Sequence, residues 1–220
     1  MTDTLIIEKA TDEIEAKTFG ATQQLLDVHQ VVYLNGKPKV ARVDTEKEDG
    51  TAIVYFSVVD EKFFVAVYLD TLPKISVRHI DTQPYHSVYF RATSKELSLT
   101  ELTSLTTLKP TSGWNKGDKK KYGNSYYQFS ALEFEPNPDA DEFEDKIKKL
   151  LDFLERDKDR VRILVEKATE HIQVASSFHN GNTMLGGHHL NKEIINRMAS
   201  LNLFIDFDIY ADGNKFNESE

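Results

Sequence analysis

The sequence SVYFRATSKELSLTELTSLTTLKPTSGWNKGD, residues 87–118, predicts a strand, a capped helix and a glycine-rich loop in direct succession. Val88 and Phe90 alternate with Tyr89 and Arg91, which is the two-residue period of a half-buried strand. We therefore expect this strand to turn an apolar side toward a core and a polar side toward solvent.

A short helix is expected next. Ser98 and Glu101 form a capping box, in which the serine oxygen accepts a backbone N–H and the glutamate reaches back to the serine. Leucines follow at three-residue spacing from Leu99, close to one helical stripe. Pro110 ends the helix, because the residue before a proline is pushed out of helical dihedral angles.

Trp114 is the only tryptophan and lies in a loop between Gly113 and Gly117. A tryptophan held in this way is either a platform for a ligand or a plug that closes the end of a core. Large aromatic side chains mostly anchor loops by burial, which favours the plug.

Composition places the chain among ordinary folded proteins. It has 220 residues, of which 40% are hydrophobic and 29% charged, so one large domain or two small ones fit. No apolar run approaches 18 residues, and the N-terminus lacks a basic segment followed by a cleavage site. Cysteine is absent, which excludes disulfides and thiolate chemistry and is compatible with a reducing compartment. We expect a cytoplasmic protein that does not enter a membrane.

The formal net charge of −9 bears on the class of partner. Nonspecific binding of nucleic acid requires a basic surface, so no nucleic-acid partner is expected. An acidic surface favours a cationic partner, or serves solubility alone.

Residues 1–85 predict a β-rich N-terminal domain. A short strand is expected at residues 5–7 and a helix over residues 12–30, interrupted by Gly20. Asn35–Gly36 supplies the two positive φ angles of a type I′ hairpin turn. Short strands joined by tight turns then predict an antiparallel meander, with residues 53–59 and 63–69 as its buried centre. The expected strands cover residues 31–34, 37–43, 51–59, 63–69 and 75–80.

Residues 86–212 predict a second, α+β domain, with a seam at residues 81–84 and a frayed polar tail at residues 213–220. The order of elements is β-α-β-α-β-α-β, which indicates a two-layer sandwich with helices on one side of a sheet. In the last strand, Ile205, Phe207 and Ile209 are expected inward and Asp206, Asp208 and Tyr210 outward. The other expected strands are 87–92, 125–135 and 171–178, and the later helices lie near 143–154, 161–168 and 190–201.

The sequence motifs of residues 86–212 and their order resemble the bacterial domain of unknown function 4279 family. The resemblance rests on Val88–Phe90, Leu97–Leu102, Leu108–Thr111, Trp114–Asp118, Gly186–Gly187 and Asp206–Tyr210. The family often has a tryptophan in the strand after the Lys-Gly-Asp loop, where this chain has Tyr126 and Tyr127. The resemblance implies an α+β fold, and small stand-alone bacterial domains of this kind are suspected immunity or defence proteins. Residues 1–85 lie outside it.

An acidic run without lysine or arginine precedes and opens the helix near 143–154. Carboxylates in a first helical turn complement the helix dipole. The functional alternative is a surface that docks a basic partner and steers its approach. The spacing and central glycine of an EF-hand calcium loop are missing. The candidate partner-binding residues are Glu133, Glu135, Asp139, Asp141, Glu142, Glu144 and Asp145.

A basic and aromatic patch follows the tryptophan. Lysines can hold phosphates and tyrosines can stack on rings, but a solvated hairpin loop has the same composition, and the net charge favours the loop. The candidate ligand residues are Trp114, Lys116, Asp118, Tyr122 and Tyr126, together with Tyr127, Lys119, Lys120 and Lys121.

Motifs for catalysis and cofactors are not apparent. The chain contains no Gly-x-Ser-x-Gly elbow, P-loop or dinucleotide fingerprint, so no cofactor is expected. His188 and His189 with Asp206 and Asp208 form a conceivable metal set, but adjacent histidines usually point in different directions. No metal is expected, although catalytic groups are assembled in space and an enzyme stays an alternative.

The main hypothesis is a non-enzymatic bacterial protein-binding domain, an immunity protein that occludes the cleft of a cognate toxin. One alternative is a sensor that binds a small ligand through the loop from Trp114 to Tyr127. The other is a metal-dependent hydrolase built on the two histidines and two aspartates. The sequence fixes neither the partner nor the oligomeric state.

Overall fold

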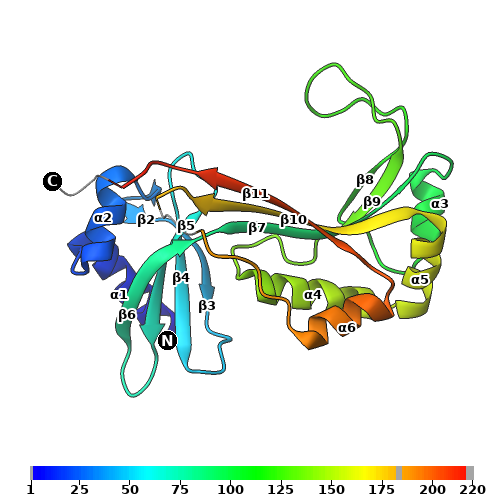
Figure 1. The fold of residues 1–220 in the computed structure, drawn as a ribbon. Coiled ribbons are helices and arrows are strands. Elements are labelled where there is room, and N and C mark those ends of the chain that lie inside the picture. The colour runs from blue at the N-terminus through cyan, green and yellow to red at the C-terminus, as the bar shows by residue number, and fades with distance from the viewer. Residues whose placement is uncertain (1, 182–184, 217–220) are drawn as a thin grey trace.

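The fold consists of two β-sheet units that meet where strand β6 passes into β7 (Figure 1). The structure, a computed structural model, describes residues 2–181 and 185–216. Its sheets have two, four and five strands. Among the described residues, no helix combines the length and apolarity needed to cross a bilayer. The mixed α+β class is the expected one.

The N-terminal unit is an antiparallel sheet in the order β3-β4-β5-β6, packed against two helices. The expected meander is confirmed, with β4 and β5 at its centre. Asn35 and Gly36 have φ angles of 53° and 78°, as the type I′ turn requires. Its elements are α1 (Thr2–Ala16), α2 (Gly20–Val28), β1 (Tyr33–Leu34), β2 (Lys37–Pro38), β3 (Val40–Asp44), β4 (Thr51–Ser57), β5 (Phe64–Asp70) and β6 (Ser76–Gln83).

The strand expected at residues 5–7 is wrong, because these residues belong to α1. Ile6, Ala10 and Ile14 recur every fourth residue and are buried against the sheet. A four-residue apolar spacing is helical, and it outweighs the local preference of two adjacent isoleucines for a strand. The helical region does break before Gly20, where α2 begins.

The C-terminal unit is a mixed five-stranded sheet in the order β11-β10-β7-β9-β8. Strands β10 and β11 are parallel, and the other pairs are antiparallel. Helices α4, α5 and α6 all lie on one side of the sheet (Figure 1). The elements are β7 (Tyr85–Ser94), α3 (Leu99–Ser104), β8 (Ser112–Trp114), β9 (Ser130–Phe134), α4 (Phe143–Glu155), α5 (Lys158–Lys167), β10 (Thr169–His179), α6 (Lys192–Ser200) and β11 (Ile205–Asp212).

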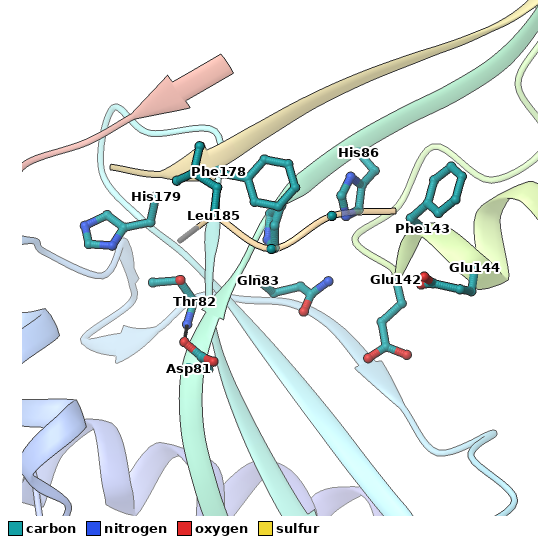
Figure 2. Close-up of a pocket in the computed structure, with 13 residues that line it drawn as sticks. Asp81, Thr82, Gln83, His86, Glu142, Phe143, Glu144, Phe178, His179 and Leu185 are labelled. Carbon is teal, nitrogen blue, oxygen red and sulfur yellow. Dashed lines mark hydrogen bonds between the residues drawn. The ribbon is translucent and has the colours of Figure 1, made fainter. Parts of the chain in front are cut away.

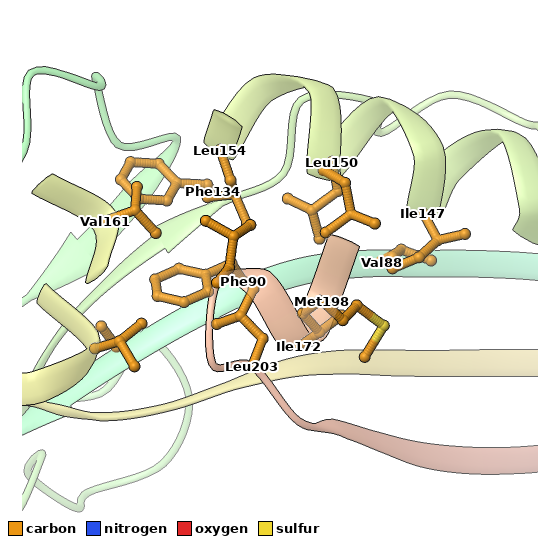
Figure 3. Packing of buried hydrophobic residues seen from close by; sticks show 14 of the residues in the cluster. Val88, Phe90, Phe134, Ile147, Leu150, Leu154, Val161, Ile172, Met198 and Leu203 are labelled. Carbon is orange, nitrogen blue, oxygen red and sulfur yellow. The ribbon is translucent and has the colours of Figure 1, made fainter. Parts of the chain in front are cut away.

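The core of this unit fills the space between the sheet and its helices (Figure 3). Phe90 on β7 and Phe134 on β9 stack with ring centroids 5.8 Å apart. Leu150 and Leu154 project from α4 onto them and are fully buried. The alternation predicted for β7 therefore places Val88, Phe90 and Ala92 inside. The capping box before α3 is also present, with Ser98 and Glu101 in their expected roles.

The strand expected over residues 125–135 is shorter than predicted and begins only at Ser130. Residues 115–129 instead form a loop that projects from the ends of β8 and β9 (Figure 1). Gly117 and Gly123 have φ angles of 89° and 77°, which break a strand, and one isolated bridge joins Lys119 to Tyr126.

Residues 213–216, the start of the expected polar tail, lie against the N-terminal unit. Asn214 Nδ2 donates to the Val28 carbonyl at 3.0 Å, and Phe216 packs beside its core. The imidazoles of His29 and His179 meet here, with their Nε2 atoms 2.9 Å apart. The remainder of that expected tail, residues 217–220, lies outside the described residues.

We expect Leu150→Ala to lower the free energy of unfolding by about 2–5 kcal/mol, because the fully buried side chain would leave a cavity between α4 and the sheet. Urea denaturation followed by circular dichroism measures the change. Ile195→Ala on α6, where the side chain is 50% exposed, is the control and should cost about 0.5 kcal/mol. Equal losses in the two variants would contradict this account of the core.

Candidate functional site

One side of the five-stranded sheet, here called the outer face, faces away from α4, α5 and α6 (Figure 1). Strand alternation and the cross-strand register place its members in rows that run from β8 to β11. The outer face comprises Ser112 and Trp114 on β8, Glu133 on β9, Tyr85, Ser87, Tyr89 and Arg91 on β7, His171 and Gln173 on β10, and Asp206, Asp208 and Tyr210 on β11.

Arg91 lies at the centre of the row between β9 and β10. Its Nε and Nη2 atoms are 2.7 and 2.6 Å from Glu133 Oε1, and the other carboxylate oxygen of Glu133 accepts a hydrogen bond from Ser112. The guanidinium carbon is also 5.0 Å from the Tyr89 ring centroid and 5.6 Å from that of Trp114. The guanidinium is therefore held in place before any partner arrives.

Trp114 closes the base of the projecting loop. Its ring stacks on Tyr127, with centroids 4.4 Å apart and planes inclined by 20°, and Phe129 is 6.5 Å away. With Tyr127 on the ring and Arg91 close by, the arrangement fits the plug better than the open platform. The indole Nε1 is nevertheless enclosed and has no hydrogen-bond acceptor among the described residues.

The other candidate ligand residues spread along the loop rather than meeting in one place. Tyr122 and Tyr126 are 78% and 55% exposed. Asp118 closes a turn, since its Oδ2 accepts the Asn115 N–H at 2.7 Å, while Lys116 Nζ donates to the Lys95 carbonyl.

Carboxylates dominate the charge of the outer face. Asp206 and Asp208 are exposed on β11, and Glu135 follows β9 and accepts a hydrogen bond from Ser87 at 2.7 Å. Burial raises the pKa of Tyr89, and nearby Glu133, Glu135 and Asp208 raise it further, while Arg91 opposes them. Among the strand residues of this face, Arg91 is the single cationic side chain if the histidines are neutral.

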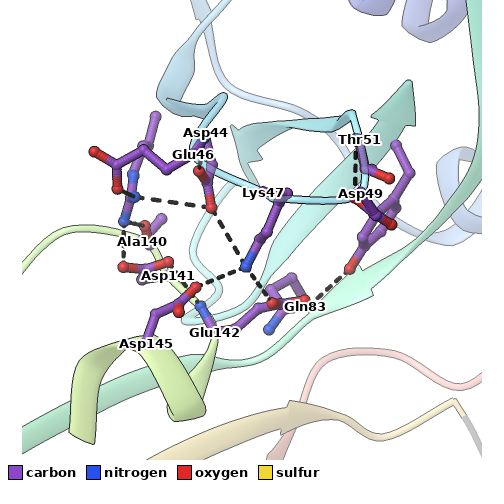
Figure 4. Close-up of polar contacts among 12 residues, drawn as sticks. Asp44, Glu46, Lys47, Asp49, Thr51, Gln83, Ala140, Asp141, Glu142 and Asp145 are labelled. Atoms are coloured by element: carbon purple, nitrogen blue, oxygen red, sulfur yellow. Dashed lines mark hydrogen bonds and ion pairs between the residues drawn. The ribbon is translucent and has the colours of Figure 1, made fainter. Parts of the chain in front are cut away.

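The second half of the acidic run lies elsewhere, in an ion network between the two units (Figure 4). Lys47 Nζ, from the turn between β3 and β4, is 2.5 Å from Glu142 Oε2 and 2.6 Å from Asp145 Oδ2. Arg42 Nη1 is 2.5 Å from Asp141 Oδ2, whose side chain is fully buried. These carboxylates bind the N-terminal unit, which the sequence did not reveal.

In this network Arg42, Lys47 and Lys149 pair with five carboxylates, namely Asp44, Glu46, Asp141, Glu142 and Asp145. Burial by itself would raise the pKa of Asp141, but hydrogen bonds from Arg42 and Lys149 hold it below its ordinary value. Asp44, Asp141 and Asp145 bring one oxygen each within 4.8 Å of one another, a spacing that a cation can bridge. Arg42 and Lys47 already supply that positive charge, so we interpret the cluster as a set of ion pairs that connects the two units.

The two remaining carboxylates of the run, Asp139 and Glu144, belong neither to the outer face nor to the ion network. Glu144 Oε1 accepts the backbone N–H of His189 at 3.1 Å, and Asp139 is exposed. The seven candidate carboxylates therefore do not form one patch. Glu133 and Glu135 instead lie near Tyr89, as Asp208 does.

A cavity of about 310 Å³ lies at the seam between the units, lined by β6, the start of α4 and the end of β10 (Figure 2). His86 lines this cavity, and Ser176 Oγ lies 2.7 Å from His86 Nδ1 and 2.8 Å from His188 Nε2. The hydroxyl can donate to one imidazole and accept from the other. No sequence motif signalled this group, because its members are far apart along the chain.

This serine is poorly placed for nucleophilic attack. Ser176 is completely buried and His86 nearly so, behind Phe143 and Phe178. Burial, helped by His188 and Lys146 and opposed by Asp141, lowers the pKa of His86 to about 3. Burial also lowers the pKa of His188, so the neutral form of both imidazoles is favoured in this buried hydrogen-bond relay.

The metal set considered from sequence does not assemble. His188 lies on the helix side of the sheet, where its ring centroid is 4.9 Å from that of Phe207. Asp206 and Asp208 point to the outer face by strand alternation, and Asp208 accepts a hydrogen bond from Gln173. The sheet separates His188 from the two aspartates, so these side chains do not meet in one metal site.

An open mixed sheet with helices on one side defines a two-layer α+β domain. The profile of a family described as "Domain of unknown function (DUF4279)" matches residues 83–212. The match covers more than half of the chain, so the chain belongs to this family, as the resemblance implied. No curated protein and no solved structure gave a significant match.

We expect Arg42→Ala to lower the free energy of unfolding by about 3–5 kcal/mol, because Asp141 would keep a buried charge without its closest partner. Lys9→Ala, which removes the exposed ion pair with Asp12, is the control and should cost about 0–1 kcal/mol. Urea denaturation measures both. A loss for Arg42→Ala no larger than the control would show that the network does not hold the units together.

Protonation of His86 should destabilise the fold in acid. Its folded pKa of about 3 lies below the ordinary value of 6.5, so the unfolded chain binds the proton more readily. Stability from the neutral imidazole is complete above pH 6.5 and declines as the pH falls toward 3, by at most about 1.4 kcal/mol per pH unit. His86→Gln should therefore flatten the pH dependence of the urea midpoint below pH 6.5. Parallel profiles for the two proteins would contradict the assignment.

Proposed function

We propose that this chain is a non-enzymatic protein-binding domain, a bacterial immunity protein that neutralises a cognate toxin by covering its active or binding cleft. The observation that carries the proposal is the outer face, an uncovered sheet surface on which Arg91, Tyr89 and Trp114 are already fixed by one another.

The residue types of the outer face support binding to a protein. Tyrosine, tryptophan and arginine dominate the residues that contribute most to interface affinity, and a face ordered in advance loses little entropy on association. Rigid sheet strands carry most of these side chains, so their geometry does not depend on the partner.

The charge of the outer face supports a basic partner. Glu133, Asp206 and Asp208 outweigh Arg91 there, and complementary charge speeds association and selects among partners. A toxin that acts on nucleic acid or another anionic substrate has a basic cleft, which this surface would fill. The mechanism is occlusion and needs no chemical step.

The burial of Ser176 also favours a binding role over catalysis. A serine nucleophile must reach its substrate, whereas this hydroxyl is enclosed between two histidines.

A sensor is the second candidate, favoured by the enclosed indole N–H of Trp114, for which the described part of the chain provides no acceptor. A ligand oxygen that reached it would change the fluorescence of this single tryptophan. No change across a panel of metabolites would remove the sensor.

We expect a tagged chain, expressed in its native cell, to retain one partner in stoichiometric amount, with a toxin-like domain identified by mass spectrometry. The double variant Asp206→Lys and Asp208→Lys should retain at least tenfold less of it, because the partner would meet like charge. Glu8→Lys with Asp12→Lys makes the same change of net charge on exposed positions of α1 and should retain it fully. An equal loss in both double variants, or no partner at all, would count against the outer face.

A further inference from the structure

We propose that the partner adds a β-strand to the exposed edge of β11, through an extended segment that alternates basic and apolar side chains. This inference rests on the proposed function and names the partner's binding segment. Addition of a strand to an open sheet edge is a recurring mode of peptide recognition, in which the backbone supplies affinity and alternate side chains supply specificity.

Strand β11 is an edge of the five-stranded sheet, paired on one side with β10 over eight residues. In the part of the chain that the structure describes, no strand pairs with its other side. Phe207, Ile209 and Tyr210 are 39%, 55% and 52% exposed, so both sides of this strand meet solvent. A long edge with exposed apolar residues is a site for pairing with another chain.

The backbone of β11 shows which groups a strand would meet. The Ile172 N–H donates to the Phe204 carbonyl at 2.9 Å, and the Asn180 N–H donates to the Asp212 carbonyl at 2.7 Å. Because orientation alternates along a strand, the even-numbered residues between them bond to β10. Phe207, Ile209 and Ala211 therefore turn their N–H and carbonyl groups toward the open edge.

The side chains specify the incoming segment. On the helix side of the sheet, the ring of Phe207 contacts His188, and its centroid is 6.0 Å from that of Phe143. Ile209, two residues further along the strand, is half exposed. An apolar side chain on the new strand would extend this layer. On the outer face, Asp206 and Asp208 call for lysine or arginine at the alternate positions.

Charge also argues against a second copy of this chain as the occupant. Two copies of β11 could pair in antiparallel orientation, with both outer faces on the same side of the joined sheet. The two-fold axis that relates the copies then passes through a pair of identical residues, one from each copy. If the axis passes through Phe207, Asp206 lies opposite Asp208 of the other copy, and if it passes through Ile209, Asp206 lies opposite Asp212. If it passes through Asp208, the two copies of Asp208 lie opposite each other. Like charges directly opposite are destabilising, so self-pairing is opposed and a basic strand is favoured.

The test uses the full chain and a capped synthetic octapeptide of alternating lysine and valine, labelled for fluorescence anisotropy. We expect saturable binding, and at least tenfold weaker binding of the matched octapeptide with glutamate in place of lysine. Hydrogen exchange followed by NMR should slow at the amides of Phe207, Ile209 and Ala211 when the peptide binds. Binding without that protection would overturn the proposal, since it would reflect surface charge alone.

A proline variant tests the backbone. Ala211→Pro removes an N–H that faces the open edge and leaves the bonds to β10 intact, so the fold should survive. It should weaken peptide binding at least fivefold, whereas Ala211→Ser, which keeps the N–H, should bind as the original chain does. Circular dichroism confirms that each variant is folded. Equal peptide binding by the two folded variants would overturn strand addition.

The remaining outcomes separate this inference from the proposed function. A stoichiometric partner in the native cell together with no peptide binding would keep the protein-binding role and remove the β11 edge. Self-association of the chain by light scattering, with Phe207, Ile209 and Ala211 protected in the absence of peptide, would replace the basic strand with a second copy and overturn the proposal.

Discussion

One-sided burial of the sheet around β7 is the constraint on which the rest of the structure depends. β7 lies in the middle of the five-stranded sheet, and it turns Val88, Phe90 and Ala92 to one side only. The helices must cover that side, because uncovered apolar rows would not form a stable sheet. Tyr89 and Arg91 alternate with them and therefore point to the outer face, which no helix of the described residues covers in Figure 1. The outer face is thus a direct consequence of the alternation that builds the core.

Burial by the helix layer is incomplete at β11. The helix layer buries the apolar residues of β7, β9 and most of β10, yet Phe207 and Ile209 remain substantially exposed. The layer is therefore incomplete at the edge where backbone groups are also open. A strand placed there would continue both layers of the domain, which links the edge to the outer face as parts of one surface.

The acidic run shows how a charge pattern is divided by tertiary structure. Glu133 and Glu135 lie on or beside the outer face, whereas Asp141, Glu142 and Asp145 are held by Arg42 and Lys47 of the N-terminal unit. A buried carboxylate is stable only with a partner, so Asp141 ties the family domain to the unit before it. This explains why the two units share contacts beyond the short passage from β6 to β7.

Local chemistry was readable from the chain. The Ser98 box, the Asn35–Gly36 turn and the alternation in β7 each involve residues a few positions apart, so the sequence by itself determined them. The burial expected for Phe207 and Ile209 on β11 was wrong, because the helix layer does not cover this edge strand and both side chains are exposed. The first helix was mistaken at residues 5–7 because the local strand preference of two adjacent isoleucines was given more weight than the four-residue apolar spacing that packs against the sheet. The pairing of Arg42 with Asp141, the relay of His86, Ser176 and His188, and the meeting of Glu133 with Arg91 were decided only by the tertiary structure. Each joins residues more than ten positions apart, and such contacts follow from strand order and packing, which no local pattern encodes.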